Sequence, residues 1–110
     1  MTDNIYNDLP APGADEVFQT LLDRPGLHLE RIVSTGQATP VGQWYDQDRD
    51  EWVLLLSGSA ELRFEDPPEL TTLSPGDYVY IAAHRRHRVK WTAPDRTTLW
   101  LALHMEETKS

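Results

Sequence analysis

The sequence predicts a small all-β domain, a sandwich or barrel of short strands with one short helix near its N-terminus. Seven or more strand-like stretches follow one another, with turn signals every eight to twelve residues. Strands and helices do not alternate along the chain, which argues against a parallel α/β sheet. The 110 residues suffice for one domain and leave no room for a second.

Residues 1–30 are expected to form an arm and a short helix that pack on the barrel. Positions 1–14 are rich in Asp, Asn, Pro and Gly, which is typical of an extended arm. Apolar residues at positions 17, 18, 21 and 22 have helical spacing, and Asp15 is a plausible helix cap. The turn residues at 24–26 end this predicted helix.

From Leu27 onward the period changes to that of strands, and the barrel is expected to cover residues 31–104. The strongest strand signal is the apolar run that starts at Glu51, and residues 60–64 alternate cleanly. The polar tail at 105–110 is expected to fray. The predicted strands are 27–32, 51–56, 60–64, 69–73, 78–82, 87–92 and 97–104.

The charge balance argues against nucleic acid as a partner. The net charge is -8 and the pI is near 4.8, whereas phosphate binding needs clustered Lys and Arg. One basic cluster, 85–88 with Lys90 nearby, is read as a solvated loop and strand face, or alternatively as a small rim that faces an anion.

Cysteine content and hydropathy predict a cytoplasmic protein. There is no cysteine, so disulfides, thiolate metal sites and a Cys nucleophile are excluded. No signal peptide is visible, and the longest apolar run, 52–56, is far too short to span a bilayer. No membrane partner is expected.

Two titratable residues, Glu51 and His87, are predicted to meet inside the barrel. Arg88 and Lys90 require the solvent face of their strand, so His87 points inward on the opposite face. A carboxylate and an imidazole at the wide end of a barrel can bind a divalent ion, hydrogen-bond a polar ligand, or bind each other. A Ser–His–Asp hydrolase is disfavoured, because no nucleophile elbow is present.

The strand that carries Glu51 is apolar on both faces, which predicts a cover on its outer side. Val53 and Leu55 share the face of Glu51, and the intervening apolar residues of 52–56 share the other. The N-terminal arm or a second subunit would cover that outer face. Since exposed apolar patches of this size usually mark an interface, a homodimer is expected.

The run around Glu51 resembles the first motif of the cupin superfamily, a group of small double-sheet β-barrels. That motif has two histidines separated by one residue, then a glutamate three or four positions on, and a glycine after six more residues. Glu51 and Gly58 have this spacing.

The run that ends at His87 resembles the second cupin motif. Gly76 and His87 match it, while Ala82 replaces its proline and His84 its second glycine. The resemblance covers about 32–104, and the chain is similar to small single-domain bacterial cupins. It implies a cupin-like double-stranded β-helix, that is, a jelly-roll barrel.

The first motif is degenerate, because its histidine pair is missing. The paired positions hold Tyr45 and Gln47, or Trp44 and Asp46, depending on the spacing. The family's usual site of three histidines and one glutamate would bind one divalent ion such as Zn, Fe, Mn or Ni.

Here that site is reduced to Glu51 and His87. Two strong ligands seldom hold a metal tightly. Asp46 or Gln47 could supply a third ligand, and His84 or His104 could swing in.

By the same resemblance, Trp44, Tyr45 and Trp91 lie where the family lines its pocket, and Gln47 joins them as a ligand-binding candidate. Aromatic walls with a few polar groups suit a small organic ligand. The first hypothesis is therefore a protein that binds or senses a small molecule at Glu51 and His87, without a tightly held metal.

Two alternatives remain. The resemblance also implies a metal-dependent enzyme of the dioxygenase, isomerase or decarboxylase class, with Glu51, His87 and Asp46 or Gln47 as ligands. The third possibility is an interaction domain whose mouth is closed by its aromatic residues. Membership of the family does not choose among the three.

Overall fold

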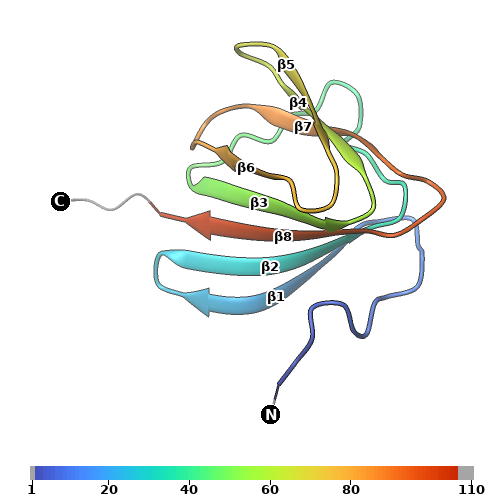
Figure 1. Ribbon diagram of the computed structural model, residues 1–110. Helices are drawn as coiled ribbons and strands as arrows, with labels where there is room; N and C mark the ends of the chain where they lie inside the picture. Colours follow the sequence, from blue (N-terminus) through green and yellow to red (C-terminus); the bar gives the residue numbers. More distant parts are fainter. Residues whose placement is uncertain (1, 107–110) are drawn as a thin grey trace.

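The computed structural model describes residues 2–106, which fold into two facing antiparallel β-sheets (Figure 1). The five-stranded sheet has the order β1-β2-β8-β3-β6, and the three-stranded sheet has the order β5-β4-β7. The strands are β1 (Val17–Arg24), β2 (Leu27–Ser34), β3 (Asp50–Ser57), β4 (Ala60–Phe64), β5 (Glu69–Leu73), β6 (Tyr78–Ile81), β7 (His87–Thr92) and β8 (Thr98–Met105).

The predicted N-terminal helix is wrong, because Val17–Arg24 is the edge strand β1, paired with β2. The register shifts between Thr20 and Leu22, so Leu21 is an extra residue in a β-bulge. This insertion interrupts the two-residue period of the strand. Val17 and Phe18, ahead of the bulge, lie on opposite faces of the strand. Together these two features gave the apolar residues a helix-like spacing although the segment is extended.

The seven other predicted strands are confirmed, with bounds that match or differ by one or two residues. The double-sheet jelly-roll arrangement is also confirmed, but the barrel is not closed within residues 2–106. The two sheets form separate hydrogen-bond ladders. Two backbone hydrogen bonds join β3 to the turn that precedes β6. Leu55 N donates to Asp77 O (3.0 Å), and Gly76 N donates to Leu55 O (2.8 Å).

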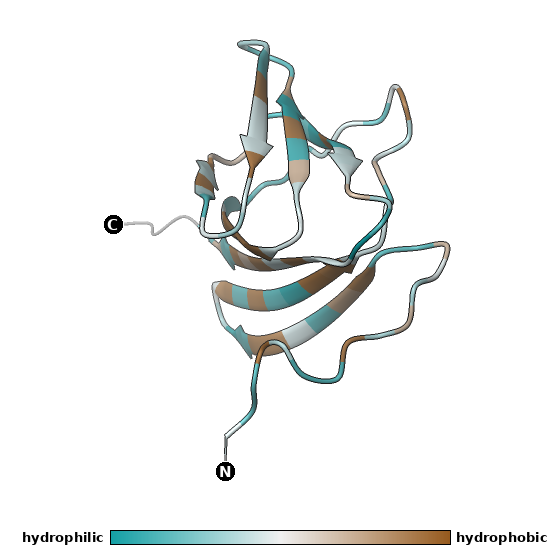
Figure 2. Cartoon of the chain, turned by 45° about the vertical axis from the view of Figure 1, so that its right-hand side comes forward, coloured by the Kyte–Doolittle hydropathy of each residue, from teal (hydrophilic) through white to brown (hydrophobic). Residues whose placement is uncertain are grey.

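The hydrophobic core lies between the two sheets, where brown segments of the strands face one another (Figure 2). Both sheets contribute because alternate residues of each strand point inward. The largest buried side chains include Phe64 from β4 and Leu55 from β3, and Trp100 from β8 lies beside them. The remaining core residues are Val53, Ala60, Leu62, Leu73, Ile81 and Ala102.

The N-terminal arm is held on the outer face of the large sheet by Arg31 of β2. The guanidinium group donates to the carbonyl oxygens of Ile5 (3.0 Å), Asn7 (2.6 Å) and Asp8 (3.1 Å). Its Nε donates to Gln19 of β1 at 2.6 Å. The N-terminal arm, which precedes β1, thus buries Arg31. Over residues 2–106 no helix has the length and hydropathy needed to cross a membrane.

Candidate functional site

A cavity of about 90 Å³ opens between the two sheets, with walls from both of them. Its apolar lining consists of Phe18, Ile32, Val53, Leu62, Ile81, Val89 and Trp100. Its polar lining consists of Glu16, Glu30, Tyr45, Gln47, Glu51, His87 and His104. The predicted meeting of Glu51 and His87 is therefore present in the structure.

Glu51 stands near the centre of the polar cluster and is only 7% exposed. The antiparallel register places it between His104 of β8 and Ile81 of β6. Its Oε1 lies 3.5 Å from His87 Nε2, and its Oε2 lies 3.5 Å from His104 Nε2. Both distances exceed those of ordinary hydrogen bonds. Within residues 2–106, the mostly buried carboxylate thus has imidazole nitrogens on both oxygens at 3.5 Å, beyond ordinary hydrogen-bond length.

The ring of His87 is oriented by a backbone carbonyl. Its Nδ1 lies 2.9 Å from the carbonyl oxygen of Arg85, and since a carbonyl only accepts, Nδ1 must carry the proton and donate. In the neutral ring, Nε2 then presents a lone pair toward Glu51. The main chain of His87 is bonded in both directions to Tyr45, which places the Tyr45 ring 5.6 Å from the imidazole.

Glu30 and His104 form a tight pair beside Glu51. His104 Nε2 lies 2.9 Å from Glu30 Oε1, and His28 Nε2 lies 3.4 Å from Glu30 Oε2. The hydrogen bond from His104 lowers the pKa of Glu30 and outweighs the opposing effect of burial. Glu30 is therefore an ionised carboxylate whose two oxygens already face imidazoles.

Glu16 and Tyr45 form the opposite side of the polar lining. Burial raises the pKa of Glu16, while a hydrogen bond donated by the Ser34 hydroxyl acts in the other direction. Burial also raises the pKa of Tyr45, and the charge of Glu16 adds to the effect. The phenol of Tyr45 therefore stays protonated and can serve as a donor.

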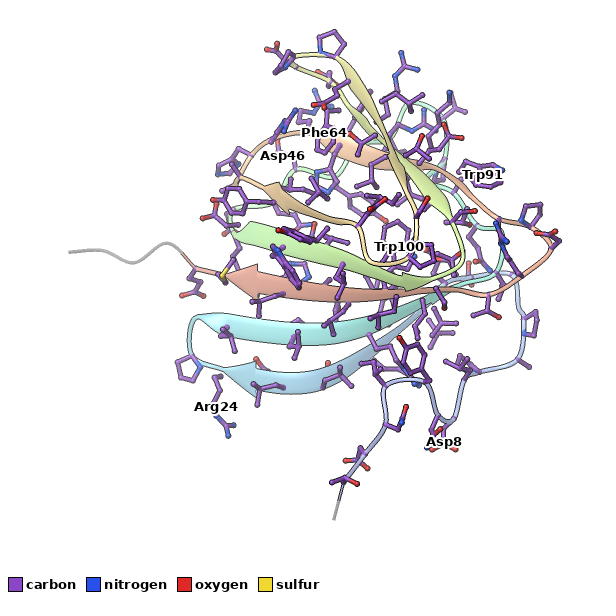
Figure 3. All side chains as sticks on the ribbon, viewed as in Figure 1. Asp8, Arg24, Asp46, Phe64, Trp91 and Trp100 are labelled. Atoms are coloured by element: carbon purple, nitrogen blue, oxygen red, sulfur yellow. The ribbon has the colours of Figure 1, made fainter. Side chains whose placement is uncertain are left out.

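Several predicted residues do not line the cavity. The Asp46 side chain is 49% exposed and lies 2.9 Å from His84 Nδ1 at the surface. Trp44 lies under the Arg86 guanidinium, and Trp91 is 39% exposed. In Figure 3, the labels of Asp46 and Trp91 lie well apart from that of Trp100, which belongs to the cavity wall. Of the seven predicted site residues, the cavity brings together Tyr45, Gln47, Glu51 and His87.

Sequence reasoning missed Glu16, Glu30 and Phe18. The signal for Glu30 was its position two residues after His28, which puts both on one face of a strand. Using that signal required knowledge that β2 pairs with β8, which brings Glu30 to His104.

Each of the three arginines in the basic cluster has a partner within the protein. Arg85 pairs with Glu69 at 3.0 Å and stacks 4.0 Å from the centre of the Phe64 ring. Arg86 pairs with Glu65 at 3.0 Å. Arg88 donates to the carbonyl oxygen of Thr39 at 2.9 Å.

A tightly held metal does not fit the residues present. The 3.5 Å between Glu51 and His87 matches two neighbouring ligands of a tetrahedral ion, which lie roughly 3.4 Å apart when the bonds are about 2.1 Å. His104 Nε2 is not available as a third ligand, since it already donates to Glu30. No group of three or more His, Asp or Glu residues suited to a metal occurs within 2–106.

The profile of the cupin domain family matches residues 32–104. A protein of Ralstonia eutropha JMP134, named as a candidate mannose-6-phosphate isomerase, has a similar crystal structure. It is 46% identical, with a TM-score of 0.92 over 97% of this chain and 99% of that one. No curated protein matches the chain.

Two more distant structures share the fold. A cupin superfamily protein of Desulfitobacterium hafniense DCB-2 is 17% identical, with a TM-score of 0.74 over 90% of this chain and 84% of that one. The cupin domain of Schizosaccharomyces pombe Cnp3 is 9% identical, with a TM-score of 0.72 over 84% and 61%.

Proposed function

The chain belongs to the cupin family, and we propose that it binds a small molecule in the cavity beside Glu51 and His87. The observation that carries this proposal is the Glu51 carboxylate, which lines the cavity, is only 7% exposed and lies 3.5 Å from the imidazoles of His87 and His104. Both imidazoles lie beyond ordinary hydrogen-bond length. Hydrogen-bond donors on a ligand could therefore bind the carboxylate more closely than these side chains do.

The cavity has the make-up of a binding site for a small ligand. Its walls are mostly apolar, and its polar groups gather around Glu51. Pockets of this kind hold a carbon skeleton by apolar contact and orient it with a few polar groups. Tyr45 and Gln47, which replace the histidine pair of the family's first motif, offer a phenol and an amide at its edge.

The alternative is a metal-dependent cupin enzyme with Glu51, His87 and a third ligand. One observation favours it, namely that Gln47 lines the same cavity as Glu51 and His87. The similar protein of Ralstonia eutropha is named as a candidate isomerase, so an isomerisation is the reaction to test first. Asp46 is the weaker third ligand, because its carboxylate faces His84.

A metal measurement on the purified protein separates the two functions. For the binding protein, we expect substoichiometric divalent metal that a chelator removes without changing ligand affinity. A stoichiometric ion that is lost in Glu51→Gln and in His87→Ala, but kept in the exposed control Asp95→Asn, would instead establish the metal enzyme.

We further propose that the protein is a homodimer that pairs through the outer face of the five-stranded sheet. Trp52 and Tyr78 lie on this face, opposite the cavity, with ring centres 5.5 Å apart. Tyr78 is 67% exposed. A second copy would cover this aromatic surface.

A further inference from the structure

The polar groups of the cavity are mostly acceptors, and we propose that its ligand is a small organic ammonium compound whose nitrogen binds at Glu51. This inference rests on the proposed binding function and adds the chemical class of the ligand.

The charge of the lining is the first support. Three carboxylates, those of Glu16, Glu30 and Glu51, face the cavity, and none of its lining residues within 2–106 is a lysine or arginine. The titratable bases of the lining are the imidazoles of His87 and His104. The carboxyl groups of the lining thus outnumber its basic side chains by three to two. Such a site attracts a cation and repels an anion.

Glu51 is the carboxylate that remains for the ligand. Glu30 receives the hydrogen bond of His104, and Glu16 receives that of Ser34. Glu51, by contrast, has only the two imidazoles at 3.5 Å. Both contacts are longer than an ordinary hydrogen bond, so a donor on a ligand in the cavity can approach this carboxylate more closely than either imidazole does.

The neighbour of Glu51 strengthens the preference for a donor. Because Nδ1 of His87 donates to the Arg85 carbonyl, the neutral ring turns an acceptor, Nε2, toward the carboxylate. Two acceptors therefore lie side by side. An ammonium group has three donors and no acceptor, so it can satisfy both without bringing a further lone pair into the site.

The walls suit the rest of such a ligand. The rings of Phe18, Tyr45 and Trp100 line the cavity, and aromatic faces attract organic cations. A cavity of 90 Å³ is room for roughly six water-sized groups, if each needs about 15 Å³. The ligand is accordingly a compact amine with a short carbon skeleton.

A phosphate ester is disfavoured by the same geometry. The three arginines of the basic cluster are bound to Glu69, Glu65 and the Thr39 carbonyl. A phosphate in the cavity would face carboxylates without a cationic side chain among the lining residues. The ligand class inferred here thus differs from the sugar phosphate in the name of the Ralstonia eutropha protein.

Matched probes test the inference. Propylamine, butylamine and cyclohexylamine are titrated into the purified protein by calorimetry at pH 7.5, each beside its alcohol and its phosphate ester. At least one amine is expected to bind at least tenfold more tightly than its two analogues. That affinity should fall at least tenfold in Glu51→Gln and stay within twofold in the exposed surface control Asp95→Asn. The comparison of amine with alcohol needs no variant, so it holds even if Glu51→Gln fails to fold.

Other outcomes are distinguishable. Tighter binding of an alcohol or a phosphate ester, or equal binding of an amine by Glu51→Gln, would overturn the ammonium class and leave a small-molecule site. If the protein binds Zn²⁺ tightly and binds none of the amines, the ammonium class is overturned and the site is a metal site. If no probe of any class binds, both this inference and the proposed binding function fail.

Discussion

Glu30 Oε1 lies 2.9 Å from His104 Nε2, although the two residues are 74 positions apart in the sequence. The pairing of β2 with β8 brings them together, since His28 and His104 are direct partners in the register. His104 thereby gives its closest hydrogen bond to Glu30 and lies 3.5 Å from Glu51. This preference leaves the Glu51 carboxylate available to the cavity.

The Glu30–His104 pair should make stability depend on pH. The pKa of Glu30 is lowered in the folded protein by the hydrogen bond of His104. Its contribution is therefore present above the ordinary carboxyl value, about 4.5, and is lost as the pH falls through the lower folded value. We expect Glu30→Gln to unfold more easily than the unmodified protein by about 1 kcal/mol at pH 7.

Urea unfolding at pH 7, 5, 4 and 3 would measure this effect. The difference between the two proteins should shrink below pH 4.5. Asp23→Asn is the matched control, because that carboxylate is 74% exposed and lies 3.7 Å from His28. A gap for Glu30→Gln that stays constant down to pH 3 would contradict the assigned pKa direction.

Gly58 and Gly42 separate backbone strain from close packing. Both have positive φ values, +85° and +86°. A Cβ at Gly58 would overlap Thr98 and lie 2.8 Å from the carbonyl oxygen of Thr97, whereas a Cβ at Gly42 meets nothing within 4 Å. We expect Gly42→Ala to destabilise by about 1 kcal/mol and Gly58→Ala by about 3 kcal/mol or more. Thermal unfolding of both variants would show this difference, and equal losses would exclude the packing explanation.

Arg31 should hold the N-terminal arm. It donates to the carbonyl oxygens of Ile5, Asn7 and Asp8 and is only 6% exposed. Without the guanidinium these contacts cannot form, so Arg31→Met is expected to speed amide exchange over residues 5–9 at least tenfold. Hydrogen–deuterium exchange with mass spectrometry measures it, with the exposed Arg24→Met as control. Unchanged exchange in Arg31→Met would show that other contacts hold the arm.

The proposed dimer can be tested on the outer face of the large sheet. Tyr78 is 67% exposed and contacts Trp52 there, so a carboxylate at this position would oppose burial by a second copy. Light scattering should give about twice 12.6 kDa for the unmodified protein and the monomer mass for Tyr78→Glu. Val41→Glu, at a site 90% exposed, should remain dimeric. A monomeric unmodified protein would disprove the interface.

The local pattern of the sequence sufficed to predict most of the strands and the inward direction of Glu51 and His87. Alternation and turn residues act over a few positions, so they can be recognised without knowing which strands pair. The single wrong element, β1, fails for a local reason as well. Its bulge at Leu21 breaks the two-residue period on which the prediction of a strand depends.

The chemistry of the site was decided only by the tertiary structure. Strand order, which no short-range pattern encodes, placed Glu30 and His104 beside Glu51. The same packing directed Asp46 to His84 at the surface and bound the arginines near the mouth to other partners. Sequence alone therefore determined that an acid and an imidazole share the interior. The folded chain determined how many acceptors surround them, because hydrogen bonds between distant strands depend on register.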